Sequence, residues 1–191
     1  MIENIKQQKL AKAKKMMLLF GLLSITMTFA GLTSAYIVSK GRPDWTMDFN
    51  LPSEFFYSTF IIFLSSLTLL VSKRKLTAGK SINSVFNWTL VTFVLGIVFI
   101  VFQFIGFNNI IDQGYYFAGA QSAIKTSFIY VLSFLHIVHL VAGLIVLIVL
   151  MFNIKKGKYV DNNLGFNLGS NFWHFLDFLW LYLFSFFYFF G

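Results

Sequence analysis

Two pairs of side chains in the second half of the chain are of types that could do chemistry. His136 and His139 are three residues apart in FLHIVHLVAG, and His174 and Asp177 are three apart in FWHFLDFLWLYLF. Residues at this spacing share one face of a helix. Neutral imidazole is the commonest metal ligand, and an Asp beside a His can share a hydrogen bond that lowers the cost of burial. Metal or haem ligation, a proton relay and contacts between helices are therefore the candidate roles.

The expected depths of these residues favour contacts between helices. At about 1.5 Å per residue, Asp177 is expected about 10 Å from the inner end of its helix, and His139 about 20 Å from the inner end of the antiparallel helix before it. This difference predicts two separate polar contacts and not one metal cage. The chain also has no cysteine, which excludes thiolate-bound metal centres. We therefore predict no catalytic, cofactor-binding or metal-binding residue in this chain.

The composition indicates a membrane protein. Of the 191 residues, 58% are hydrophobic, 20% are aromatic and only 12% are charged. A soluble domain carries about twice that charged fraction, and one domain of this size cannot bury 26 Phe residues in water. The net charge of +8 lies between apolar runs, as in membrane proteins, so we predict no nucleic-acid partner.

Five apolar segments meet or approach the roughly 20 residues that a helix needs to cross a bilayer. They are continuously apolar, without the alternation of barrel strands. We predict an all-α fold: one integral membrane domain over residues 1–191, built as a bundle of five transmembrane helices. The shortest span, the second, is expected to need tilting or local thinning of the bilayer. The predicted spans are residues 17–38, 55–71, 85–107, 127–152 and 171–190.

The basic residues predict the orientation of the bundle, because loops on the cytoplasmic side are enriched in Lys and Arg. Most of them fall in the N-terminal arm and in the second and fourth connections: Lys6, Lys9, Lys12, Lys14, Lys15, Lys73, Arg74, Lys75, Lys80, Lys155, Lys156 and Lys158. The other connections have Lys40, Arg42 and Lys125. We predict the N-terminus inside and the C-terminus outside. Residues 1–15 are expected to be a retained cytoplasmic basic arm, folded as a short helix on the membrane surface.

A few further side chains within the spans are candidates for contacts between helices or with lipid. Gln103, Trp173 and Trp180 join the histidines and Asp177 in this group, with Trp173 expected near the end of its span. Gly143, four residues after His139, would allow a neighbouring helix to approach closely.

Three stretches together resemble subunit III of the haem–copper oxidases. HIVHLVAG resembles the HxxHxxxG signature in the middle of that family, and WHFLDFLWLYLFSFFYFFG resembles its terminal WHFxDxxWLxLF…YxxG. SITMTFAGLTSAYIV resembles its SExMFFAxLxxAY segment, and Gln103 stands where the family commonly has Gln. The resemblance extends from the first span to the last residue.

The resemblance implies the five-helix short form of this subunit, which lacks the first two helices of the longer form. The complex would be a proton-pumping terminal oxidase that reduces dioxygen to water in aerobic electron transport, in the bacterial cytoplasmic membrane. Subunit III would hold no haem or copper and have no catalytic centre of its own. It would stabilise subunit I, bind phospholipid and support proton uptake. Its implied partners are subunits I and II. A subunit IV and a larger respiratory supercomplex are further candidate partners.

Two positions depart from the family pattern. Ile25 stands where the family usually has a membrane Glu, and Gly106 stands where an acidic residue often follows the Gln. A role that the family's carboxylates have at these two positions therefore cannot be assigned to this chain. A hydrophobic carboxyl-reactive reagent is expected not to label the first span. Two alternatives remain open: a haem b-binding, quinol-oxidising membrane subunit that uses the histidines as axial ligands, and a small transporter or scaffold. Whether the oxidase takes electrons from cytochrome c or from quinol stays open as well.

Overall fold

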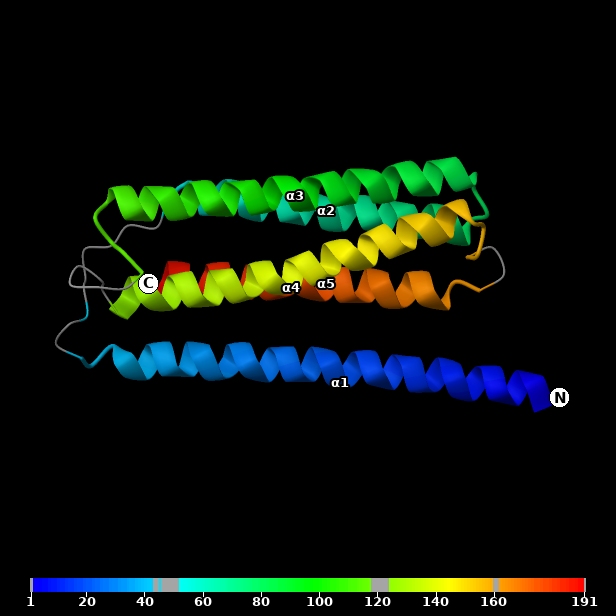
Figure 1. Cartoon of the computed structure of the whole chain (residues 1–191), viewed down its shortest axis with the longest axis horizontal. Coiled ribbons are helices and arrows are strands. Elements are labelled where there is room, and N and C mark those ends of the chain that lie inside the picture. Colours follow the sequence, from blue (N-terminus) through cyan, green and yellow to red (C-terminus); the bar gives the residue numbers. More distant parts are fainter. Residues whose placement is uncertain (1, 43–44, 46–51, 118–123, 160–161, 191) are drawn as a thin grey trace.

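A computed structural model describes residues 2–42, 45, 52–117, 124–159 and 162–190 of the chain. These residues form five α-helices, each long and apolar enough to cross a membrane (Figure 1). The predicted all-α fold with five membrane-spanning helices is confirmed. The helices are α1 (Ile2–Ser39), α2 (Glu54–Thr77), α3 (Ile82–Asp112), α4 (Ile124–Lys155) and α5 (Leu164–Phe190).

All five helices extend beyond their predicted spans. The basic arm is not a separate surface helix, because α1 continues without a break from Ile2 to Ser39 and extends beyond the rest of the bundle (Figure 1). Helix α2 has 24 residues and measures about 36 Å, but this length includes the basic residues Lys73 to Lys75, so the tilting or local thinning expected for its apolar part stays a prediction. Helix α5 begins at Leu164, seven residues before the predicted start of its span.

The connections place most of the basic residues at one end of the molecule. The N-terminus, the α2–α3 turn and the α4–α5 connection lie together on the right of Figure 1, and the C-terminus lies on the left. We call the right-hand end, with Lys15, Lys80 and Lys158, the basic end. Gly79 lies in the α2–α3 turn with φ +64°, a backbone conformation that favours glycine.

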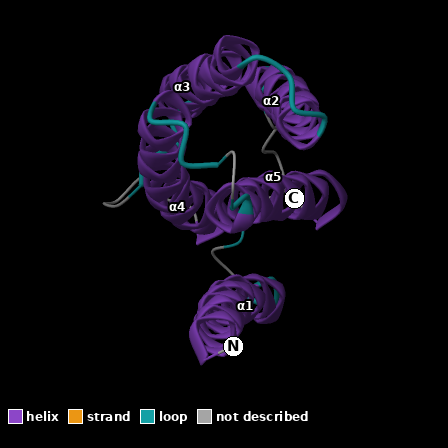
Figure 2. Cartoon of the chain, turned by 90° about the vertical axis from the view of Figure 1, so that its right-hand side faces the viewer, coloured by secondary structure: helices purple, strands orange, loops and turns teal. Residues whose placement is uncertain are grey.

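Helices α2 to α5 surround a common interior, and α1 lies outside this ring (Figure 2). Each ring helix packs against its two neighbours in the order α2, α3, α4, α5 and back to α2, while α1 packs on α4 and α5. The interior is filled by large side chains of α5. Trp173 and Trp180 are 1% and 0% exposed, and Phe99 of α3 packs edge-on against Trp180 at 5.1 Å.

Small residues on two ring helices make room for the indole of Trp173. A Cβ atom at Gly96 of α3 would lie 2.7 Å from this ring, and one at Gly143 of α4 would lie 3.2 Å from it. Side chains at these positions would therefore force the helices apart. The close approach predicted for Gly143 is confirmed: the hypothetical Cβ atom would also lie 2.8 Å from Leu176 of α5.

Helix α1 is attached to the ring mainly by the half further from the basic end. Phe29, Thr33 and Tyr36 are its buried side chains in the described region. The hydroxyls of Thr33 and Tyr182 are 2.9 Å apart, and the Tyr36 hydroxyl donates to the carbonyl of Phe190 at 3.1 Å. Apolar side chains of the other half, such as Met17 and Phe20, are exposed, so lipid or another subunit must cover them.

Candidate functional site

The polar residues of α5 that stood out in the sequence face α2. The Nδ1 atom of His174 lies 2.6 Å from the Oγ atom of Ser66. Asp177, one turn further along α5, is only 3% exposed and lies close to the same serine. Among the described residues, no hydrogen bond of ordinary geometry reaches either carboxyl oxygen of Asp177. His174 and Asp177 therefore form, with Ser66, a polar contact between two helices deep in the spans.

Both tryptophans of α5 also donate hydrogen bonds to α2. The indole N–H of Trp173 donates to the Oγ atom of Ser65 at 3.1 Å, and that of Trp180 donates to the Oγ1 atom of Thr59 at 3.0 Å. Trp173, which was expected near a span end, is buried within the ring nine residues after the start of α5, so its indole packs between helices. Each indole thus combines a large apolar contact with a satisfied polar atom.

His136 lies inside the ring, at the level of Trp180. Its imidazole is fully buried, with its centroid 5.2 Å from Trp180 and 6.0 Å from Phe99. Neither ring nitrogen has a hydrogen-bond partner among the described residues. The surroundings of this histidine are therefore mostly aromatic.

His139 is turned away from the ring interior and toward α1. Its Nδ1–H donates to the carbonyl of Leu135 in its own helix at 2.7 Å, and its ring packs edge-on against Phe29 of α1 at 5.7 Å. On α1, Ile25 is one turn from Phe29 and is partly buried against the core. The position where the family pattern has Glu is thus an apolar packing position in this chain.

Depth does not separate the polar residues, contrary to the expectation from the sequence. Because α5 begins at Leu164, Asp177 lies about 20 Å from the start of that helix, a depth similar to that of His139. Orientation separates the histidines instead: His136 faces α3 and α5, His139 faces α1, and His174 faces α2. Among the described residues, no three His, Asp or Glu side chains are grouped so that they could hold a metal ion.

Gln103 makes a further contact between helices. Its Nε2–H donates to the Oγ atom of Ser58 at 2.9 Å, joining α3 to α2 inside the bundle. The neighbouring departure from the family pattern, Gly106, also has a packing reason. A Cβ atom at this position would lie 2.8 Å from the ring of Phe55, so an acidic side chain would not fit without movement of that ring.

The serine and threonine side chains of α2 that contact the other helices were not predicted from the sequence. Their spacing in the sequence nevertheless indicates two faces of this helix. Ser58, Ser65 and Ser72 are seven residues apart, and so are Thr59, Ser66 and Lys73. A seven-residue repeat keeps side chains on one face of a helix. The first set is buried, and Ser72 lies 2.9 Å from Thr89 of α3. In the second set, Thr59 and Ser66 meet Trp180 and His174 of α5.

This site can hold helices together. The hydrogen bonds described above join hydroxyl, indole, amide and imidazole groups of neighbouring helices. Such contacts contribute about 0.6 kcal/mol each on average in membrane bundles.

Comparison with known sequences assigns the chain. The family model for cytochrome c oxidase subunit III matches residues 6–191, nearly the whole chain. The chain belongs to the cytochrome c oxidase subunit III family. It is therefore a non-catalytic subunit of a haem–copper oxidase complex, as the motifs suggested. The alternative of a haem-binding subunit or a transporter is not favoured.

Several relatives within the family support the assignment. Subunit 3 of cytochrome bo(3) ubiquinol oxidase from Buchnera aphidicola subsp. Baizongia pistaciae is 36% identical over 140 residues, covering 70% of this chain and 67% of the relative. The Pseudomonas aeruginosa protein of the same name is 33% identical over 172 residues, covering 86% and 78%. Cytochrome c oxidase subunit 3 of Bacillus sp. (strain PS3) is 29% identical over 165 residues, covering 84% and 77%. Other oxidase subunits are therefore partners of this chain.

Proposed function

We propose that this chain is the structural subunit III of a proton-pumping oxidase that reduces dioxygen to water in a bacterial cytoplasmic membrane. Its immediate partners are subunits I and II, which hold the haem and copper, and this chain itself binds neither. Its work is to stabilise subunit I and to support proton uptake through many turnovers. The names of the relatives, which are subunits of ubiquinol and cytochrome c oxidases, support this proposal.

One structural observation carries the argument for a supporting role. The histidines, Asp177 and Gln103 point into the bundle or toward a neighbouring helix, and the interior is filled by Trp173, Trp180 and His136. The outward faces are apolar, with exposed Phe, Leu, Ile, Val and Met side chains on all five helices. A rigid body with an apolar surface suits lateral packing against another membrane subunit.

The distribution of charge supports an orientation for that packing. The N-terminus and both connections at the basic end carry most of the Lys and Arg residues. The positive-inside rule places this end in the cytoplasm. The basic end would then lie on the side of the membrane from which an oxidase takes up its protons.

Affinity purification and turnover together test the proposed role. With a tag on the C-terminus, solubilisation of the native membrane in mild detergent is expected to co-purify subunits I and II in equal amounts with this chain. In a strain that lacks this chain, the remaining oxidase is expected to start at near-normal oxygen consumption and to lose activity faster during continuous turnover. An oxidase that keeps the same activity over the same number of turnovers would refute the supporting role.

A further inference from the structure

Asp177 is the acidic side chain that lies deepest within the described spans. It is 3% exposed and about 20 Å from the start of α5. Neither carboxyl oxygen has a hydrogen-bond partner of ordinary geometry among the described residues. An ionised carboxylate in such a place is costly, so the side chain is best accommodated as a neutral acid that carries its proton. An apolar side chain would pack here at lower cost, so packing alone does not explain the carboxyl group.

A row of polar side chains leads from Asp177 toward the basic end. Ser66 of α2 lies close to Asp177, and its Oγ atom is 2.6 Å from the Nδ1 atom of His174. His174 is one turn nearer the basic end than Asp177 on α5, and Asn171 is one turn nearer than His174. The Nε2 atom of His174 has no hydrogen-bond partner among the described residues. This second ring nitrogen can therefore bind water.

The row ends at a cleft near the basic end. The cleft lies between α1, α2 and α5 and has a volume of about 620 Å³, large enough to hold water. We call it the α1–α2–α5 cleft; its polar lining is Lys15, Lys73, Asn167 and Asn171. Asn171 is the deepest of these side chains on α5. It is one turn from His174, a separation that one water molecule can bridge.

Toward the opposite end, aromatic rings close the seam between α2 and α5. Trp180, one turn beyond Asp177, is fully buried and stacks on Phe55 with 6.0 Å between the ring centroids. Phe56 of α2 packs edge-on against Phe184 of α5 at 4.8 Å. These rings separate Asp177 from the opposite end of the bundle, whereas the polar row connects it to the basic end.

The helices packed on α5 present few other titratable groups to Asp177. On α2, the first charged side chain toward the basic end is Lys73, at the cleft. On α4, His139 lies at a similar depth but faces α1. On α1, the side chain near this level is the apolar Phe29. Among the described residues, His174 is thus the titratable group placed to exchange a proton with Asp177.

We propose that Asp177 is a proton-exchange site, connected to the basic end through Ser66, His174 and the α1–α2–α5 cleft. In release, the carboxyl group gives its proton to the Oγ atom of Ser66, and Ser66 gives its own proton to Nδ1 of His174. The Nε2–H of His174 then gives a proton to water in the cleft. The carboxyl group becomes a carboxylate, the imidazole changes tautomer and the water becomes hydronium, so protons and charge balance. The reverse steps restore the neutral acid.

The site deepens the proposed function, and it rests on that function in placing the basic end in the cytoplasm. This is the side from which the oxidase takes up its protons. A buried carboxyl group that releases and regains a proton there gives the subunit a proton reserve, which is a specific way of supporting proton uptake.

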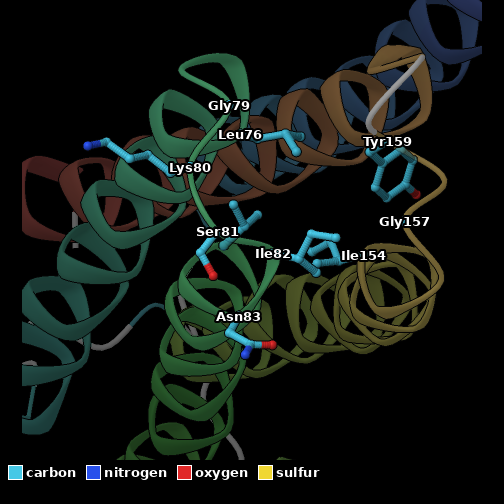
Figure 3. A pocket seen from close by; sticks show the side chains of 10 residues that line it. Leu76, Gly79, Lys80, Ser81, Ile82, Asn83, Ile154, Gly157 and Tyr159 are labelled. Atoms are coloured by element: carbon cyan, nitrogen blue, oxygen red, sulfur yellow. The ribbon is translucent and has the colours of Figure 1, made fainter.

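A second cleft at the basic end makes a useful contrast (Figure 3). It has a volume of about 490 Å³ and lies between the α2–α3 turn and the α4–α5 connection. In Figure 3, Lys80 extends away from Tyr159 and Ile154. The described residues that line this cleft include no histidine and no acidic side chain. It is therefore not expected to exchange protons with Asp177.

Infrared spectroscopy of the intact purified oxidase tests the site. The difference between the spectra of the wild type and the D177N variant isolates the carboxyl group of Asp177. We expect a band of a protonated carboxyl group in the wild type at neutral pH that D177N lacks. After rapid mixing with D₂O, this band should shift as deuterium replaces the proton. If D177N removes no such band, the carboxyl group is ionised and the proposal is overturned.

The rate of the exchange tests the route. H174Q keeps a group that can hydrogen-bond to Ser66 but does not carry a proton, and S66A removes the hydroxyl. Both should slow the exchange about 100-fold, a size typical of a positioned proton-transfer group. S66T keeps a hydroxyl and should exchange like the wild type. H139Q is the matched control, because His139 lies at a similar depth but faces α1, and it should also exchange like the wild type.

Two results would overturn the route. Equal rates in the wild type, S66A and H174Q would show that neither side chain carries the proton. Slowing by H139Q as large as that by H174Q would show exchange through general motion of the bundle. Co-purification of subunits I and II is recorded in the same samples, so a missing carboxyl band in an intact complex refutes this inference alone. A wild-type chain that purifies without those subunits would instead refute the proposed function.

Discussion

The side chains of Ser66 and His174 meet across α2 and α5, with 2.6 Å between Oγ and Nδ1. The hydrogen bond from Trp173 to Ser65 lies beside this contact, and a further α2–α5 hydrogen bond joins Trp180 to Thr59 about two turns away. Together the three contacts fix the register of the two helices that close the ring. The histidine is thus placed to join helices, although its type and spacing also suit a ligand.

A double-mutant cycle at Ser66 and His174 should measure this contact directly. We expect S66A and H174A each to lower the free energy of unfolding, and the coupling between them to be about 0.6–1.7 kcal/mol, the range of hydrogen bonds between membrane helices. Unfolding of the chain in mixed micelles with increasing dodecyl sulfate, followed by circular dichroism, gives the values. Thr28, which donates to Ser24 in its own helix, offers a control: T28A combined with H174A should show no coupling.

Substitution of Gly96 should show how tightly the ring closes on Trp173. We expect G96A to destabilise the chain by about 1–3 kcal/mol, because the added methyl group would lie 2.7 Å from the indole and overpack the interior. Gly31 of α1 has nothing within 4 Å of its hypothetical Cβ atom, so G31A should be neutral or stabilising by up to about 1 kcal/mol. Equal effects of the two substitutions would contradict the packing described for the ring.

Truncation of Trp180 should have a large effect on stability. We expect W180A to cost about 3–5 kcal/mol, since it removes a fully buried ring together with its hydrogen bond to Thr59. Tyr188 is also in α5 but is 60% exposed, and Y188A should change the stability of the isolated chain by less than about 1 kcal/mol. Thermal release of the tagged chain from the complex provides a second measurement. A change in stability of less than about 1 kcal/mol for W180A would mean that the ring interior is not packed around this indole.

The absence of cysteine makes the orientation simple to test. Single cysteines replace Lys80 at the basic end and Gly114 at the opposite end, and intact cells are treated with a maleimide that cannot cross the membrane. We expect labelling of G114C only, because the positive-inside rule places the basic end in the cytoplasm. After the membrane is permeabilised, both variants should react. Labelling of K80C in intact cells would reverse the orientation.

Much of the fold could be predicted from the sequence because long apolar runs leave few alternatives in a membrane. The predicted spans all fall within observed helices, but the ends of the helices could not be predicted. Polar residues such as Asn167 placed the predicted start of the fifth span too late, although a helix can continue past the hydrocarbon into the interface. Lys6 to Lys15 likewise suggested a surface helix, whereas α1 continues straight through them.

The partners of the candidate site were harder to predict than its residues. His136, His139 and His174 stood out because ionisable groups in membrane spans are costly. Which helix each one faces depends on the order of the helices around the ring, and the spacing of residues within one helix does not contain that order. The serine and threonine partners on α2 were overlooked because hydroxyls are common in spans. Their seven-residue spacing was visible and would have identified two faces of α2.

A difference spectrum tests the central claim most directly. The chain is purified through a C-terminal tag, and reduced-minus-oxidised spectra are recorded before and after it is separated from its partners. We predict an oxidase haem spectrum for the complex, with the haem staying entirely with the large partner subunit and the separated chain colourless. A separated chain that keeps the sharp reduced bands of a bis-histidine haem would contradict the account, because His136, His139 or His174 would then be ligands and this subunit would take part in electron transfer.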